Sequence, residues 1–248
     1  SGGTDMLGVN NSNPATCFPA AVTMASSWDP DILHAVGTAI GEEARAQGVG
    51  VVLGPGCNLK RNPLCGRNFE YYSEDPYLSG KLAAGFIRGV EGQGVGTSLK
   101  HFAANSQELN RFTSDSVLDE RTLRELYLTG FEIAVKEGKP ATVMCSYNKL
   151  NGIHASDHKE LLTDILRTQW GFDGMVVTDW GAMNDRIKGF RAGCDLNMPG
   201  GSGFLEKECA LAVKNGTLSE TDIDNSVHRI LKQVSRAVKI LKIPVSCD

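Results

Sequence analysis

The sequence predicts an α/β fold in which a parallel sheet closes into a (β/α) barrel, and three observations lead there. Short apolar runs alternate with segments of helical periodicity, as is typical of a parallel sheet covered by helices. The chain has 248 residues, close to the ~250 of one such barrel. Polar or aromatic residues follow nearly every predicted strand, where a barrel places its site. We therefore expect one domain over residues 1–248.

Five apolar segments are predicted to be strands. The segment 49–53 is apolar on both faces and rich in valine, which favours a strand buried inside a parallel sheet. The other predicted strands cover residues 98–99, 142–145, 175–178 and 194–198.

Helices are expected between these strands. The first begins where Asp29 precedes Pro30, because aspartate is a good N-cap and proline suits the first helical position. Further helical stretches lie near residues 78–90, 119–137, 157–169 and 183–191. For the last helix, Ser219 and Asp222 form a capping box. One apolar stripe follows it, made of Ile223, Val227, Ile230, Leu231, Val234, Val238 and Leu241.

The composition excludes some classes of partner. The net charge is −4 and the sequence pI is about 5.8, so the surface repels phosphate backbones and anionic lipids. No apolar run approaches the ~20 residues needed to span a bilayer. We expect neither nucleic acid nor membrane as a partner.

The seven cysteines include no C-x-x-C pair. Scattered cysteines in a chain of this size are mostly buried small hydrophobes, which favours a reducing compartment. The N-terminal segment has no features of a signal peptide and reads like the interior of a longer chain. The localisation therefore stays open, with the cytoplasm slightly favoured.

The residues at the strand ends suit a sugar. Arginine, lysine and histidine donors, a carboxylate and a tryptophan complement paired hydroxyls and an apolar ring face. Each residue also has an ordinary structural explanation: Asp179 as a helix N-cap, Arg67 in a surface ion pair, Trp180 and Tyr147 as core aromatics. Lys100 and His101 alone constitute no motif. The glycines at 48–50 and 92–96 precede their strands, which argues against a nucleotide site.

Long motifs in a fixed order show a resemblance to a known family. They are Ala15–Pro19, Gly54–Gly56, Gly66–Pro76, Lys100–Asn105, Gln107-Glu108 with Arg111, Asp119–Leu128, Val143–Asn148 and Val177–Ala182. From about Pro14 to about Pro244 the chain resembles the barrel domain of glycoside hydrolase family 3, of the β-glucosidase type.

This resemblance implies a retaining hydrolase of terminal β-linked glucosides that uses no metal and no cofactor. Asp179 matches the family's catalytic nucleophile, and Trp180 matches the aromatic residue beside it. Four residues match the groups that hold the terminal sugar: Arg67, Lys100, His101 and Arg111. Met144 and Tyr147 match residues that line the same subsite. We expect the nearby cations to keep Asp179 ionised and ready to attack the anomeric carbon.

The sequence departs from the family pattern in two places. In most relatives, a glutamate on a following α/β-sandwich domain is the acid/base, and we expect that residue to lie off this chain, on a complementary chain or domain. The relatives' N-terminal Thr-Asp-Gly-Pro-His-Gly-like motif does not occur here. The expected fold is thus a TIM-like barrel, incomplete or collapsed at its N-terminal strand. Glu70, Glu74 and Glu108 are conceivable internal acids, although no motif supports them.

Other functions stay open at this stage. The chain could be a barrel that binds sugars but is catalytically impaired, or its sugar could be xylose or arabinose. A different enzyme class is an aldolase in which Lys100 forms a Schiff base. That chemistry needs a lowered lysine pKa, which a nearby Asp179 carboxylate would oppose.

Overall fold

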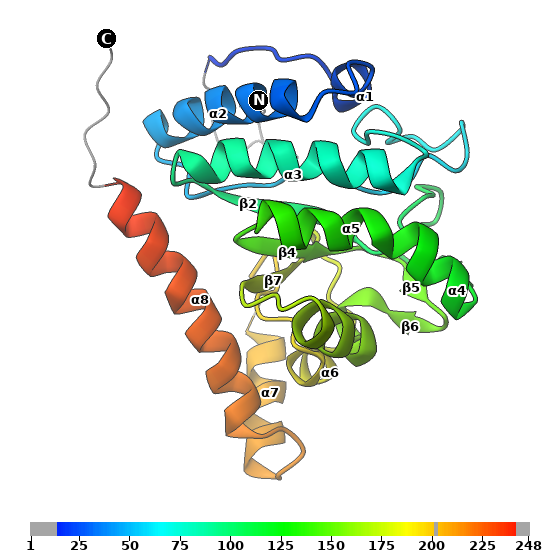
Figure 1. Cartoon of the computed structure of the whole chain (residues 1–248). Helices are drawn as coiled ribbons and strands as arrows, with labels where there is room; N and C mark the ends of the chain where they lie inside the picture. Colours follow the sequence, from blue (N-terminus) through cyan, green and yellow to red (C-terminus); the bar gives the residue numbers. More distant parts are fainter. Residues whose placement is uncertain (1–13, 201–202, 242–248) are drawn as a thin grey trace.

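A parallel sheet of four strands forms the centre of the computed structural model, which describes residues 14–200 and 203–241 (Figure 1). The strands lie in the order β1-β2-β4-β7. Because neighbouring strands are parallel, their carboxyl ends meet at one edge of the sheet. The four strands are β1 (Val51–Val52), β2 (Gly96–Phe102), β4 (Thr142–Cys145) and β7 (Met175–Thr178).

Helices connect the strands and pack on the sheet. Two of them, α2 (Pro30–Ala46) and α3 (Pro76–Gly92), run side by side along it (Figure 1). A nearly continuous helical stretch joins β2 to β4, with α4 (Glu120–Thr122), η1 (Leu123–Leu128), α5 (Thr129–Ile133) and η2 (Ala134–Gly138). The remaining helices are α1 (Ala21–Ala25), η3 (Ala155–Asp157), η4 (Glu160–Gln169), α6 (Arg186–Ala192), α7 (Phe204–Lys214) and α8 (Glu220–Leu241).

A second, small sheet lies beyond the carboxyl ends of β2 and β4. It consists of β3 (Asp115–Ser116), β5 (Lys149–Leu150) and β6 (Ile153–His154). Its strands belong to the loops that follow β2 and β4, and Asn148, which precedes β5, donates to the carbonyl of Ala103, which follows β2. The small sheet thus orders the two loops on this edge.

Aspartate caps start the main helices. The Asp29 carboxylate accepts a hydrogen bond from the Asp31 amide at 2.8 Å, and Pro30 occupies the first turn. Asp75 caps α3 in the same way, accepting from the amides of Tyr77 and Leu78. These contacts satisfy amide donors that have no partner inside the helix.

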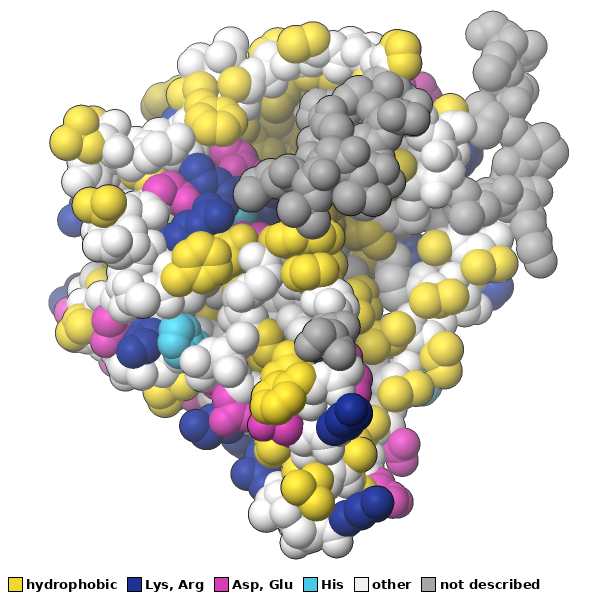
Figure 2. All heavy atoms as spheres, turned by 180° about the vertical axis from the view of Figure 1, so that it is seen from behind, with side chains coloured by type: hydrophobic (Ala, Val, Ile, Leu, Met, Phe, Trp, Pro, Cys, Tyr) yellow, Lys and Arg dark blue, Asp and Glu magenta, His cyan; other side chains and the backbone are white. Residues whose placement is uncertain are grey.

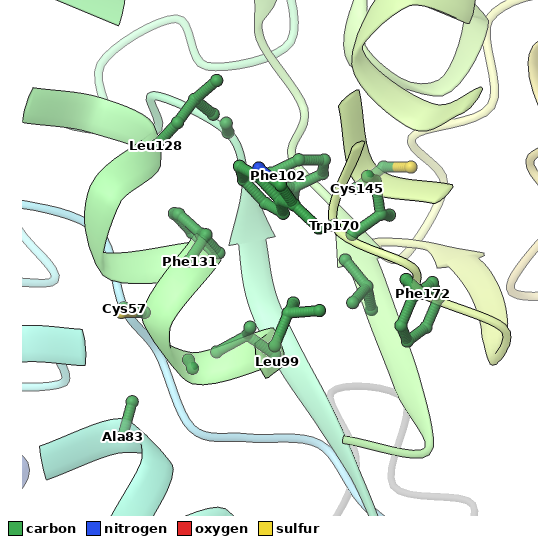
Figure 3. Close-up of a cluster of buried hydrophobic side chains, with 14 of the residues drawn as sticks. Cys57, Ala83, Leu99, Phe102, Leu128, Phe131, Cys145, Trp170 and Phe172 are labelled. Carbon is green, nitrogen blue, oxygen red and sulfur yellow. The ribbon is translucent and has the colours of Figure 1, made fainter. Parts of the chain in front are cut away.

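The core fixes the position of β2. Phe102 is fully buried and packs edge-on against Phe131 and Trp170, with ring centroids 5.2 and 5.7 Å away (Figure 3). Leu99, on the same strand, is also fully buried in this core. The two residues between them, Lys100 and His101, make their polar contacts with the neighbouring loops. Packing of Leu99 and Phe102 in the core therefore determines the position of Lys100 and His101.

The α/β architecture predicted from the sequence is confirmed. Two predicted strands, 142–145 and 175–178, are reproduced residue for residue, whereas 49–53 shortens to β1 and 98–99 lengthens to β2. The strand expected at 194–198 forms only one bridge, between Leu196 and Val177. Over the described residues the sheet stays open, in keeping with an incomplete barrel.

The expected helices are present with shifted ends. The helix expected near 183–191 begins three residues later because Asp185 is its cap, and the one expected near 157–169 also begins three residues later, at Glu160. At the start of α8 the Ser219 cap forms, with the Asp222 amide donating to the Ser219 hydroxyl at 3.1 Å. Of its predicted apolar stripe, Ile223 and Ile230 pack on the body. Val227, Leu231, Val234 and Val238 are exposed, and the side chain of Leu241 lies outside the described residues.

Two further features concern the sequence predictions on membranes and cysteines. Within the described residues no helix has both the length and the apolarity to cross a bilayer. The thiols of Cys57, Cys65, Cys145, Cys194 and Cys209 are free and buried, and that of Cys17 is free and exposed. Cys247 lies outside the described residues.

Candidate functional site

Charged and aromatic side chains gather at the carboxyl edge of the sheet. Asp179 and Trp180 follow β7, Tyr147 follows β4, and Lys100 and His101 lie near the end of β2. The loop after β1 supplies Arg67, Glu70 and Tyr71, and the loop after β2 supplies Asn105, Glu108 and Arg111. Figure 2 shows a face of the molecule on which basic and acidic side chains lie together in a hollow bordered by apolar ones.

Asp179 is held through one of its two oxygens. Oδ1 accepts hydrogen bonds from the Trp180 amide at 2.6 Å and from the Tyr147 hydroxyl at 3.0 Å. Oδ2 is buried and has no hydrogen-bond partner among the described residues. It lies 3.3 Å from Nε2 of His101 and 4.0 Å from Nη1 of Arg67. The carboxylate is thus oriented, with one oxygen unengaged beside cationic and aromatic groups.

His101 is enclosed on every side. Its side chain is 1% exposed, and the Asn58 side chain bonds both its backbone amide and its backbone carbonyl. The ring contacts Arg67 through Nε2 at 2.8 Å and the Tyr71 hydroxyl through Nδ1 at 3.0 Å. Burial, together with the charges of Arg67, Lys100 and Arg111, lowers the pKa of His101 well below its ordinary value. The ring is therefore neutral near pH 7.

Glu70 joins two of the cations. Its Oε2 accepts from Nε of Arg67 at 2.8 Å, and its Oε1 pairs with Nζ of Lys100 at the same distance. Burial alone would raise the pKa of Glu70, but the charges and hydrogen bonds of Lys100 and Arg67 outweigh it and lower the pKa. Glu70 is therefore an anion that fixes the spacing of both cations.

Arg111 forms the opposite wall of the cluster. Its guanidinium pairs with Glu108 at 2.8 Å and stacks over the Tyr147 ring, 4.2 Å from the ring centroid. Phe112 packs against Tyr147 at a centroid distance of 4.5 Å, and the Arg111 guanidinium also lies over the Phe112 ring, 5.5 Å from its centroid. Burial, and then the charge of Asp179, raises the pKa of Tyr147 to about 12. Tyr147 thus stays protonated and keeps donating to Asp179.

The structure places two predicted site residues differently from the rest. The Trp180 side chain is 46% exposed, so its ring lies open beside Asp179 and is not a core aromatic. Met144 is buried in an apolar cluster with Met175 and Val177. The structure brings six of the predicted residues into one cluster: Arg67, Lys100, His101, Arg111, Tyr147 and Asp179.

Three residues in contact with the cluster were not singled out from the sequence. Asn58 clamps the backbone of His101, Tyr71 contacts its ring, and Asn105 contacts Tyr71. Asn58 follows the first predicted strand, which was a usable signal. Tyr71 and Asn105 are 34 positions apart, and single-sequence patterns do not report such pairings.

The cluster is suited to binding a neutral polyhydroxylated ligand. Among the described residues, no group of histidine, cysteine, aspartate and glutamate side chains is arranged to hold a metal ion. The acidic residues near Asp179 are already paired with cations. Charged donors and acceptors with partial exposure can instead hydrogen-bond hydroxyl groups.

The fold and the cluster together define an α/β protein with an oriented carboxylate among cations and aromatic rings at the carboxyl edge of a parallel sheet. A family model described as the glycosyl hydrolase family 3 N terminal domain matches residues 4–233. The chain belongs to glycosyl hydrolase family 3, as the sequence motifs predicted.

Relatives and solved structures agree with this assignment. A "Thermostable beta-glucosidase B" of Acetivibrio thermocellus is 55% identical over 95% of this chain. An "Exo-alpha-(1->6)-L-arabinopyranosidase" of Bifidobacterium longum is 47% identical over 98% of the chain. Beta-glucosidase 3B from Thermotoga neapolitana, solved in complex with alpha-D-glucose, superposes with a TM-score of 0.90 over 94% of the chain at 47% identity. The chain spans 31% of each relative and 34% of the solved chain.

Proposed function

We propose that this chain is the nucleophile-bearing part of a retaining glycosidase that cleaves terminal, non-reducing β-D-glucosidic bonds. Asp179 is the nucleophile in this proposal. The observation that carries it is the asymmetric contact pattern of Asp179, in which Oδ1 has two donors and buried Oδ2 has none. Membership of family 3 and the names of the relatives support the same substrate class.

The reaction proceeds in two displacements. Asp179 Oδ2 attacks the anomeric carbon and forms a glycosyl ester while the bond to the leaving oxygen breaks, and that oxygen takes a proton from the acid/base residue. A water molecule then attacks the anomeric carbon, gives its proton to the same residue and releases the Asp179 carboxylate. Two inversions give net retention.

The cations and aromatic groups hold the sugar during these steps. Arg67, Lys100 and Arg111 present donors to ring hydroxyls, and His101 fixes the position of the Arg67 donor. The half-exposed Trp180 ring offers a flat apolar surface to the sugar. Tyr147 holds Asp179 in place. Met144 packs against Met175 and Val177 of β7, the strand that Asp179 follows.

The acid/base in this proposal comes from outside the cluster. Retention needs a second carboxyl about 5–5.5 Å from the nucleophile. Glu70 has a lowered pKa and pairs with two cations, so it is a poor proton donor. Glu108 is engaged by Arg111 and Asn105. We assign the role to a residue on further polypeptide, since relatives are about three times longer than this chain.

The name of one relative favours a second candidate sugar. The arabinopyranosidase relative shares 47% identity with this chain, which favours testing an α-L-arabinopyranoside beside the β-D-glucoside. The aldolase alternative finds no support, because the Lys100 ammonium is engaged by Glu70 at 2.8 Å and is not a free nucleophile.

Asp179→Ala, made in the protein as it is encoded, tests the nucleophile. We expect hydrolysis of an aryl β-D-glucoside to fall by at least about 10³-fold, since a reacting group is removed. Added azide can enter the space that the carboxylate leaves and attack the anomeric carbon from the same side. The expected product is an α-glucosyl azide, identified by NMR.

Asp173→Ala is the matched control, because its side chain is 86% exposed and pairs only with Lys232 among the described residues. This variant should keep the parent activity. If Asp179→Ala kept its activity, the nucleophile assignment would be wrong. Calorimetry with glucose separates a barrel that binds sugar without turnover from one that binds none.

A further inference from the structure

The two ring nitrogens of His101 have different partners, and these partners determine where its proton lies. A neutral imidazole carries one proton, on Nδ1 or on Nε2. Nδ1 faces the Tyr71 hydroxyl at 3.0 Å, and Nε2 faces Nη2 of Arg67 at 2.8 Å. The ring is 1% exposed, so solvent cannot substitute for either partner.

Arg67 favours a free Nε2, because it faces this nitrogen as a donor. A guanidinium has only donors and keeps its charge in proteins, and an Arg67 N–H points at Nε2 of His101. Nε2 must therefore offer its lone pair. A proton on Nε2 would place two N–H groups against each other across 2.8 Å inside a buried cluster.

Tyr71 and Asn105 complete the arrangement on the other side of the ring. Nδ2 of Asn105 donates to Oε1 of Glu108 at 3.1 Å and to the Tyr71 oxygen at 3.2 Å. The Glu108 carboxylate can only accept, so it fixes which way the Asn105 amide points. The Tyr71 oxygen keeps a second lone pair for the N–H of Nδ1.

We propose that Tyr71, oriented by Asn105, holds the proton of neutral His101 on Nδ1, so that His101 gives no hydrogen bond to Oδ2 of Asp179. The inference rests on the proposed function in one respect, that Asp179 is the nucleophile. Oδ2 lies 3.3 Å from Nε2 and has no donor among the described residues. A donor there would stabilise the attacking lone pair and weaken the nucleophile. Tyr71 is thus a positioning residue for the reaction.

The charges around His101 support the neutral state. Arg67 and Tyr71 face it from the loop after β1, together with Glu70, and Lys100 precedes it on β2. Arg111 and Glu108 face it from the loop after β2, and Asp179 from the end of β7. The three cations disfavour a second proton on the ring.

Nitrogen-15 NMR of the protein labelled only in histidine tests the proposal without substrate. Protonated and unprotonated ring nitrogens resonate far apart, and couplings to the ring carbons distinguish Nδ1 from Nε2. The chain has five histidines, and His101→Gln identifies the signal of His101 by its disappearance. We expect Nδ1 protonated and Nε2 unprotonated at pH 7. A proton on Nε2 in the unaltered protein overturns the proposal whether or not any variant folds.

Tyr71→Phe removes the acceptor, and Tyr72→Phe is the matched control on the neighbouring tyrosine, whose ring packs in the core. In Tyr71→Phe the N–H of Nδ1 is left buried without an acceptor, whereas Arg67 keeps Glu70 as an acceptor when it turns away from Nε2. We therefore expect the proton to move to Nε2 and kcat to fall about tenfold, the equivalent of one hydrogen bond, with KM little changed. An unmoved proton contradicts the proposal.

The two proposals fail separately. Activity that survives in Asp179→Ala removes the nucleophile assignment and leaves the position of the His101 proton as measured by NMR. Conversely, a proton found on Nε2 removes the role of Tyr71 and leaves the test of Asp179 untouched.

Discussion

Burial of His101 makes the stability of the protein depend on pH. Its pKa in the folded state is well below the ordinary value of 6.5, because of burial and three nearby cations. Below pH 6.5 the unfolded chain therefore binds a proton that the folded chain refuses, and the free energy of unfolding decreases as pH falls. One such histidine contributes a slope of up to about 1.4 kcal/mol per pH unit.

His101→Gln is expected to reduce this slope, measured by urea denaturation between pH 7 and pH 5. His34→Gln on the exposed side of α2 is the control, and it should leave the slope as it was. His158 also has a pKa lowered by burial, so part of the slope persists in the His101 variant. An unchanged slope would mean that His101 is protonated in the folded state.

At the residue scale, much of the cluster could be predicted from the sequence. Asp179 stands directly after a strand and Lys100 near the end of one, and parallel topology brings strand ends together. Tyr71 and Asn105 could not be predicted, since their role depends on the ring orientation of His101. From the sequence, Trp180 could lie either in the core or at the site. The structure shows that it is not in the core, because it is 46% exposed.

At the element scale, the contact between α2 and α3 depends on glycine. A Cβ on Gly89 would meet the His34 carbonyl oxygen and lie 2.7 Å from the Thr38 amide. Backbone atoms cannot move aside as a flexible side chain can. We expect Gly89→Ala to destabilise the protein by about 1–3 kcal/mol, as is usual for overpacking, in spite of the better helix propensity of alanine.

Gly92→Ala in the same helix is the matched control. A Cβ on Gly92 meets nothing within 4 Å, so this change should be neutral or stabilising by up to about 1 kcal/mol. Both variants are compared by thermal and urea denaturation. Equal stability of the two would show that α2 and α3 lie farther apart than the structure places them.

Helices and inner strands were predictable because their signals are local. Asp29 before Pro30 and the Ser219 cap depend on residues within one turn. The segment 194–198 has the apolar pattern of a strand but pairs through a single bridge. Asp195, within this segment, is buried and pairs with arginines of two helices, Arg167 and Arg229. No local sequence pattern reports such pairs.

At the scale of the whole molecule, Asp195 joins segments that lie far apart in the sequence. Its carboxylate is fully buried and accepts from Arg167 of η4 at 2.8 Å and from Arg229 of α8 at 2.9 Å. It also accepts from the Val176 amide of β7 at 2.8 Å. One side chain thus connects the sheet, an outer helix and the C-terminal helix α8.

Asp195→Asn should therefore weaken the attachment of α8 as well as overall stability. Removal of the anion leaves two largely buried guanidinium groups without compensation, which typically costs about 3–5 kcal/mol.

Asp173→Asn is the matched control, because Asp173 also pairs with a residue of α8, Lys232, but is 86% exposed. Exposed pairs contribute at most about 1 kcal/mol. Urea denaturation should separate the two variants by more than about 2 kcal/mol, and limited proteolysis should cut α8 first in Asp195→Asn. Equal losses in both variants would show that burial of Asp195 does not determine the stability of this joint.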